Sequence, residues 1–119
     1  MTHNASTGRI GEDFAAAWLE QKGYEILYRN WRHQHWEIDI IAVKKNVLHF
    51  IEVKTRASRT FGYPEDNVSK KKIAYLIDAG EEFLFKYPHW QRIQFDILAI
   101  TINPGKAKSE YFFIEDIYL

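Results

Sequence analysis

Cysteine is absent from the 119 residues of the chain. Disulfide bonds and thiolate metal sites are therefore excluded, and a reducing compartment would cost the protein no stability. The first eight residues are polar, and no stretch offers the roughly 20 consecutive apolar residues that a membrane-spanning helix needs. We therefore expect a soluble, cytoplasmic protein that has no contact with the membrane.

An excess of charge of one sign is also absent. Sixteen lysines and arginines balance sixteen aspartates and glutamates, so the formal net charge is zero. Proteins that bind nucleic acid irrespective of sequence usually carry a basic excess, so this balance argues against that class. It leaves a nuclease open, because catalytic acids subtract from the total and a local basic patch can persist in a neutral chain.

No repeat, low-complexity run or interdomain linker divides the chain, and its length suits a single domain, residues 1–119. The spacing of apolar residues predicts helices at 7–22 and 68–87, and strands at 24–32, 36–44, 47–55, 93–102 and, in two short segments, 110–114 and 117–119. The order αβββαββ indicates an α/β domain with a central mixed β-sheet flanked by helices. The apolar stripe expected to face the core in the first helix is Ile10, Phe14, Ala17 and Trp18.

The most informative part of the sequence is the pair of strands joined by Lys45-Asn46 alone, which predicts a two-residue hairpin. In that register Asp39 faces Glu52, and Glu37 faces Lys54. Side chains alternate between the two faces of a hairpin, so these four charged groups share one face at its open end. The opposite face is largely apolar and carries Ile38, Ile40, Ala42, His49, Ile51 and Val53. We therefore expect an interior hairpin that is covered on both sides.

Two carboxylates directly opposite one another destabilise a strand pair, and one of their pKa values rises. A divalent cation removes this cost, because carboxylates are hard oxygen ligands suited to Mg²⁺ or Mn²⁺. Such a metal could hold a phosphate oxygen and acidify a water, while Lys54 stabilises charge on the phosphate. The pattern thus points to phosphodiester hydrolysis by Asp39, Glu52 and Lys54. The alternative is that Lys54 only neutralises acids on a solvated strand face.

Further segments carry a resemblance to a known family. They are Gly11-Glu12, Ala15, Gly23-Tyr24, Asn30-Trp31-Arg32, Glu37-Ile38-Asp39-Ile40-Ile41, Phe50-Ile51-Glu52-Val53-Lys54-Thr55-Arg56, Phe61-Gly62, Lys72, Ala79 and Phe95-Asp96. In their order and spacing, over nearly the whole chain, these segments resemble the YraN-like family of predicted endonucleases. That family is placed in the PD-(D/E)XK nuclease superfamily, together with archaeal Holliday-junction resolvases.

The resemblance implies a restriction-endonuclease-like (PD-(D/E)XK) core and roles for the residues at matching positions. Asp39 matches the metal-binding aspartate of the superfamily, and Glu52 and Lys54 match its Glu-x-Lys pair. Glu12 matches an acid of the first helix that would complete the metal site, directly or through water. One departure is Trp36, which stands where the family usually has a glycine and would narrow the cleft.

Other residues have both a functional and an ordinary interpretation. Glu37 is expected to partner Lys54, and the alternative is a surface acid. Asp96 lies inside an apolar strand, where a buried carboxylate needs a partner, so it would brace the first helix or the site. The alternative is a strand-end acid that faces water. A basic rim that contacts nucleic acid is expected from Arg56, Arg59 and Lys72.

Taken together, these features lead us to expect a Mg²⁺- or Mn²⁺-dependent endonuclease that acts on DNA, with branched or damaged DNA as candidate substrates. The alternative is a non-catalytic nucleic-acid-binding or protein-interaction module on the same fold, which the zero net charge favours. The sequence does not choose between DNA and RNA. It also leaves the oligomeric state open, although a homodimer would suit a junction with two-fold symmetry.

Overall fold

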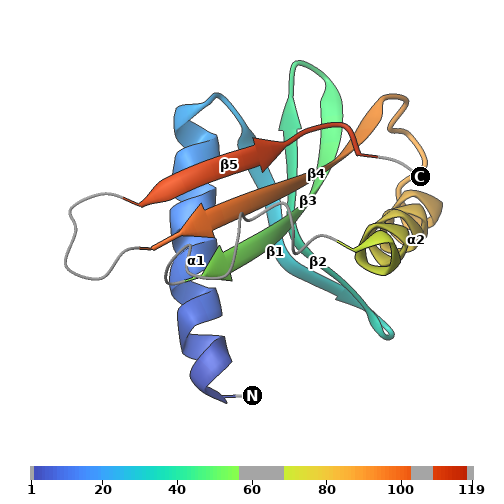
Figure 1. The fold of residues 1–119 in the computed structure, drawn as a ribbon. Coiled ribbons are helices and arrows are strands. Elements are labelled where there is room, and N and C mark those ends of the chain that lie inside the picture. The colour runs from blue at the N-terminus through green and yellow to red at the C-terminus, as the bar shows by residue number, and fades with distance from the viewer. Residues whose placement is uncertain (1, 57–68, 103–108, 118–119) are drawn as a thin grey trace.

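Five strands form one sheet with a helix on each face (Figure 1). The computed structural model describes residues 2–56, 69–102 and 109–117, with side chains described from residue 10 onward. The elements are α1 (Thr2–Gln21), β1 (Glu25–His33), β2 (Trp36–Lys44), β3 (Val47–Arg56), α2 (Lys70–Lys86), β4 (Ile93–Thr101) and β5 (Glu110–Ile114). The strand order is β1-β2-β3-β4-β5, with β3 and β4 parallel and the other neighbours antiparallel. The expected α/β class with a mixed central sheet flanked by helices is therefore confirmed.

Both faces of the sheet are buried, as expected for an interior hairpin. The core beneath α1 contains Ala15, Leu19, Tyr24, Ile40, Ala42, Ile51, Leu98 and Ile100. The core beneath α2 contains Trp31, Ile38, Ile41, Leu48, Phe50, Leu76, Ala79 and Phe83. None of the helices within the described ranges combines the length and the apolar character needed to cross a membrane.

Helix α1 faces the sheet with smaller side chains than we predicted. Ile10 and Phe14, two members of the expected core stripe, are 49% and 38% exposed. The buried residues of the helix are Gly11, Ala15, Ala16 and Leu19. The reason is the close approach of the helix to β3, because a Cβ atom at Gly11 would collide with the Thr55 side chain. Large apolar side chains cannot fit at this point of closest approach, so Ile10 and Phe14 lie on the flank of the helix, whereas Leu19 is buried further along it.

The chain ends differently from the prediction of a last strand at 117–119. Ile117 is not in a strand, and the two residues after it lie outside the described part. Asp116 has a φ of +59°, which interrupts extended backbone. The Ile117 N–H then donates to the carbonyl of Phe95 at 2.7 Å. This turn holds Ile117 against the start of β4.

Candidate functional site

The predicted hairpin register is correct from the pair Lys44–Val47 to the pair Ile40–Ile51. Beyond that point regular pairing between β2 and β3 stops, so the expected ladder pairs Asp39–Glu52 and Glu37–Lys54 do not form. The reason is a side-chain acceptor: the Val53 N–H donates to the Asp39 carboxylate at 2.8 Å. A carboxylate oxygen therefore takes the place that a strand carbonyl would have in a continued ladder.

The first residues of β2 separate from β3 but stay paired with β1. This pairing extends to the pair His33–Trp36. Ile38 consequently packs in the core beneath α2. The prediction placed Ile38 on the same face as Ile40, which packs beneath α1, so that assignment was wrong. The strict alternation of side chains fails here because the strand is no longer held on both edges.

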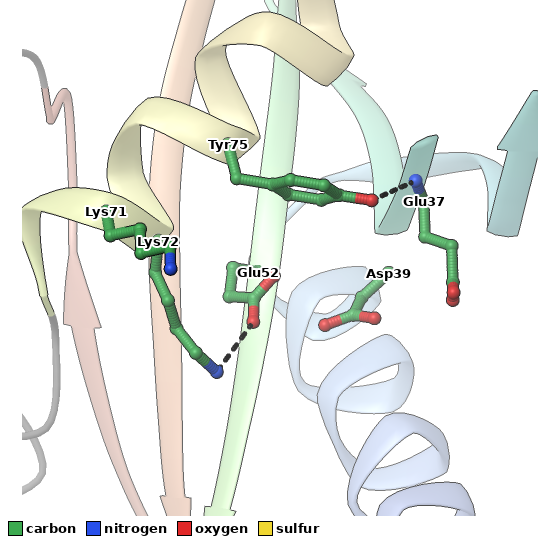
Figure 2. A pocket seen from close by; sticks show the side chains of 6 residues that line it. All are labelled: Glu37, Asp39, Glu52, Lys71, Lys72 and Tyr75. Atoms are coloured by element: carbon green, nitrogen blue, oxygen red, sulfur yellow. Dashed lines mark hydrogen bonds and ion pairs between the residues drawn. The ribbon is translucent and has the colours of Figure 1, made fainter. Parts of the chain in front are cut away.

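The separation of β2 and β3 opens a cleft of about 430 Å³ between the sheet and the start of α2. Its lining residues are Glu37, Asp39, Glu52, Lys71, Lys72 and Tyr75. Figure 2 shows the carboxylates of Asp39 and Glu52 in the same space, with the Lys72 side chain reaching toward Glu52. The two acids thus meet across the cleft although they are not ladder partners.

Helix α2 supplies the opposite wall of the cleft, and its start is well defined. The Ser69 hydroxyl accepts the Lys72 N–H at 3.1 Å, which caps the helix. One turn further on, the Tyr75 hydroxyl accepts the Glu37 N–H at 3.0 Å and donates to the His35 carbonyl at 2.8 Å. These two bonds tie the β1–β2 turn to α2 and set the width of the cleft.

Burial and like charge act together on the acid pair. Burial, followed by the charge of Glu52, raises the pKa of Asp39 to about 7, although the Val53 N–H partly opposes this rise. Burial also raises the pKa of Glu52, while Lys72 and Lys54 lower it. The cleft therefore resists two full negative charges unless a cation joins them.

Two lysines flank Glu52. The Lys72 ammonium lies 3.9 Å from the Glu52 carboxylate. Burial, and then the neighbouring Lys72, lower the pKa of Lys54, whereas Glu52 and Asp39 oppose that change. Lys54 is thus within the field of both acids, as the sequence led us to expect, and Lys72 adds a second ammonium.

Glu37 does not take the role expected for it. It is exposed, and its carboxylate lies 3.4 Å from the guanidinium of Arg32, its ladder partner on β1. The predicted pairing of Glu37 with Lys54 depended on the β2–β3 ladder, which has already ended. Glu37 contributes its charge and its backbone N–H to the cleft wall.

Glu12 lies beside the cleft but is engaged elsewhere. Its carboxylate accepts a hydrogen bond from the Asn30 side chain at 2.8 Å, and its charge contributes to the raised pKa of Asp39. Among the described residues, no group of three or more histidines, aspartates or glutamates is placed to hold a metal ion. The structure therefore brings Asp39 and Glu52 together, with Glu12 beside them and bonded to Asn30.

Asp96 is fully buried, so the interpretation as a water-facing acid is wrong. It also braces neither α1 nor the cleft. Its carboxylate binds the His49 ring nitrogen at 2.7 Å, the Gln94 amide at 2.9 Å and the Asp116 N–H at 2.9 Å. Tyr24 packs edge-on against His49, and burial, followed by the charges of Asp96 and Glu115, raises the pKa of Tyr24 to about 12. This polar cluster is separate from the residues that line the cleft.

The candidate nucleic-acid contacts divide into three cases. Lys72 lines the cleft, whereas Arg56 is the half-buried last residue of β3 and is not among the lining residues. Arg59 lies outside the described residues. Lys71 and Tyr75 also line the cleft, although neither was among the expected site residues. Their spacing at the start of a predicted helix was visible, but only the packing of α2 over the open hairpin shows that they face the acids.

Comparison with known proteins gives a family. Residues 11–100 match the model described as "Uncharacterised protein family UPF0102". A UPF0102 protein of Flavobacterium psychrophilum is 42% identical over 112 residues, which cover 94% of each chain. A UPF0102 protein of Chloroherpeton thalassium is 38% identical over 125 residues, 99% of this chain and 97% of that one. One of Clostridium perfringens is 38% identical over 117 residues, with 98% and 96% covered. These names state no activity, so the function has to be argued from the site.

Proposed function

The chain belongs to the protein family UPF0102, and from that premise we propose that it is a metal-dependent endonuclease that hydrolyses phosphodiester bonds in DNA. The observation that carries this proposal is the meeting of Asp39 and Glu52 in one cleft, with Lys54 and Lys72 beside them. Burial raises the pKa of both acids, and the charge of Glu52 raises that of Asp39 further, so the pair weakens the fold and a purely structural role is poorly motivated.

We further propose that the fold is a PD-(D/E)XK core. Support comes from a hairpin that opens at an aspartate, followed on the next strand by Glu52-Val53-Lys54. The parallel pairing of β3 with β4 and the helix α1 against β3 are consistent with the resemblance described above. Branched or damaged DNA remains the candidate substrate.

The donor set suits Mg²⁺ or Mn²⁺. Mg²⁺ is usually bound through one or two carboxylates, with water and substrate phosphate completing its shell. Asp39 and Glu52 would hold it, and Glu12 is a third candidate that would act through water because its carboxylate is bonded to Asn30. A cation between the two acids would remove the repulsion that raises the pKa of Asp39.

Each residue then has a chemical role. A divalent ion held by Asp39 and Glu52 would polarise the scissile phosphate and acidify a water molecule. The Lys54 Nζ, which lies in the field of both acids, would stabilise charge that develops on the phosphate. Lys72 neutralises Glu52 in the free protein, and with Lys71 it can contact phosphate oxygens of the strand.

The test is cleavage of linear, flapped and four-way DNA in Mg²⁺ or Mn²⁺. We expect Asp39→Ala, Glu52→Ala and Lys54→Ala to lose at least about a hundredfold in rate, as expected when a charge-stabilising group is removed. Asp78→Ala, which changes an exposed acid on α2, is the matched control and should cleave like the wild type. Equal activity in the wild type and all three cleft variants would identify a contaminant and end the proposal.

A second candidate is a non-catalytic nucleic-acid-binding or protein-interaction module. Two observations favour it: the zero net charge, and the Lys72–Glu52 contact at 3.9 Å that partly neutralises the cleft without metal. Calorimetric titration with Mn²⁺ separates the two candidates. Absence of binding to the wild type, or unchanged binding in Asp39→Ala, supports the non-catalytic module.

A further inference from the structure

The ring of Tyr75 is a part of the cleft wall that the proposed chemistry does not use. Its hydroxyl is fully occupied, because it accepts the Glu37 N–H and donates to the His35 carbonyl. In Figure 2 the ring reaches from α2 toward Glu37, close to the two carboxylates. With the hydroxyl bound and the side chain 37% exposed, the ring is the part that remains to contact a ligand.

Two further rings continue from Tyr75. The centroid of the Trp36 ring lies 5.1 Å from that of Tyr75, and the His35 ring lies 4.3 Å from that of Trp36. Tyr75 and His35 are both exposed. The hydrogen bonds of the Tyr75 hydroxyl to the backbone of Glu37 and His35 hold the Tyr75 ring in one arrangement, so this ring loses little conformational freedom when a ligand binds.

Positive charge lies directly beside the row. Lys71 and Lys72 precede Tyr75 by four and three residues, so all three share one face of α2, and all three line the cleft. A positive groove that follows the phosphates, combined with rings on which bases stack, is how proteins hold single strands. Glu37, Asp39 and Glu52 line the same cleft and offset the charge of the two lysines, so base stacking has to carry more of the binding than phosphate contacts do.

We propose that Tyr75 stacks on an unpaired nucleobase, so that the bound strand is single-stranded where it crosses the cleft. A base inside a duplex has both faces covered by its neighbours, and it must leave the stack before a protein ring can reach it. The preferred ligands are therefore flaps, gaps and single-stranded ends rather than continuous duplex. The inference rests on the proposed nuclease function only for the cleavage of the bound strand. The binding of the strand does not depend on that function.

The test measures binding by fluorescence anisotropy without added divalent cation, so that no metal-dependent cleavage occurs. The probes are a labelled single strand of about 12 nucleotides, within the length range that such surfaces hold, and a duplex of equal length. We expect the single strand to bind more tightly, and Tyr75→Leu to weaken its binding roughly 5- to 150-fold. Tyr75→Phe keeps the ring and should retain most of the affinity. Phe85→Leu is the matched control, because Phe85 is 87% exposed on the same helix and is not a lining residue of the cleft.

An abasic strand separates stacking from an indirect effect on the fold. It keeps the phosphates and sugars but has no base to stack, so it should bind the wild type as weakly as the normal strand binds Tyr75→Leu. Combining the abasic strand with Tyr75→Leu should add little further loss. An equal loss from Tyr75→Leu with both strands, or wild-type binding to duplex as tight as to the single strand, would overturn the proposal.

Failure of this inference and failure of the nuclease proposal give different results. Ring-dependent binding of the single strand without cleavage in any metal supports the stacking role and removes the nuclease. Cleavage of single-stranded or flapped DNA by Tyr75→Leu at the wild-type rate, with unchanged binding of the single strand, supports the nuclease and removes the stacking role. Absence of any binding to the single strand by the wild type overturns the stacking role, whatever the cleavage assay shows.

Discussion

Replacing Asp39 by asparagine should stabilise the metal-free protein while abolishing the proposed activity. The carboxyl group has a pKa of about 7 in the folded chain, against 3.8 in its ordinary state, because of burial and the charge of Glu52. The folded protein therefore binds this proton more tightly than the unfolded chain does. This contribution to stability is complete below about pH 4 and is lost as the pH rises toward 7.

The structure sets the size of the effect. A difference between 3.8 and about 7 corresponds to about 4 kcal/mol of opposition to folding once the group is ionised in both states. Asparagine has no such charge, and its amide oxygen can still accept the Val53 N–H that Asp39 accepts at 2.8 Å. Its amide group remains partly desolvated, so we expect about half of that figure, ~2 kcal/mol, at pH 8. For a chain of this length that is a rise in Tm of roughly 8 °C.

The assay is thermal unfolding of the wild type and Asp39→Asn in EDTA from pH 4 to pH 8, followed by circular dichroism. Because the cost of the desolvated amide is present at every pH, the variant should be about 2 kcal/mol less stable than the wild type at pH 4 and ~2 kcal/mol more stable at pH 8. Asp78→Asn, the same change at an exposed site on α2, is the control and should shift Tm little at any pH. Saturating Mn²⁺ at pH 8 should raise the Tm of the wild type but not that of Asp39→Asn, because a ligand stabilises the state that binds it. A variant that is less stable than the wild type at pH 8, or a gain that does not depend on pH, would refute the reasoning.

Three further changes test separate parts of the structure. Gly11→Ala places a methyl group against the Thr55 side chain and should lower the free energy of unfolding, measured in urea, by about 1–3 kcal/mol. The additional change Thr55→Ala should partly restore it. An unchanged urea midpoint in Gly11→Ala would contradict the close packing of α1. Asp96→Ala leaves buried partners without their acceptor and should lower the free energy of unfolding by about 3 kcal/mol without changing the affinity for Mn²⁺. Loss of Mn²⁺ binding in a folded variant would show that Asp96 is connected to the cleft. Lys72→Met removes the ammonium that lies 3.9 Å from Glu52. It should tighten Mn²⁺ binding severalfold, measured by calorimetry, and should weaken binding to a single strand. Weaker Mn²⁺ binding would show that Lys72 does not compete with the cation.

Local features of the sequence predicted the hairpin well. The strands expected at 36–44 and 47–55 correspond to β2 and β3, and the two-residue loop correctly set the register from Lys44 to Ile40. The same register failed at the next pair, Asp39 and Glu52, because the carboxylate of Asp39 replaced a backbone acceptor. No pattern of apolar residues signals where a side chain will take over a ladder bond, so the prediction placed the acids correctly as neighbours but wrongly as partners.

Packing between distant segments escaped the sequence analysis. The prediction took the core face of α1 from the helical spacing of its apolar residues, whereas the close contact with β3 selects small residues around Gly11. Asp96 was recognised as needing a partner if buried, but its partner His49 lies 47 positions away and became adjacent only when β3 paired with β4. Hydrophobic periodicity reports that a face is covered, not which element covers it.

What the sequence determined by itself is the chemistry available to this protein: no thiol, no net charge, and Asp39, Glu52 and Lys54 on two strands of a tight hairpin. These features depend on residue types and on backbone geometry over a few residues, which are local. The tertiary structure decided the rest: that β2 leaves β3 at Asp39, and that α2 packs over the opening with Lys72 and Tyr75. The tertiary structure decides these features because the depth of a cleft, and the pKa values of the groups inside it, depend on burial by segments that are far apart along the chain.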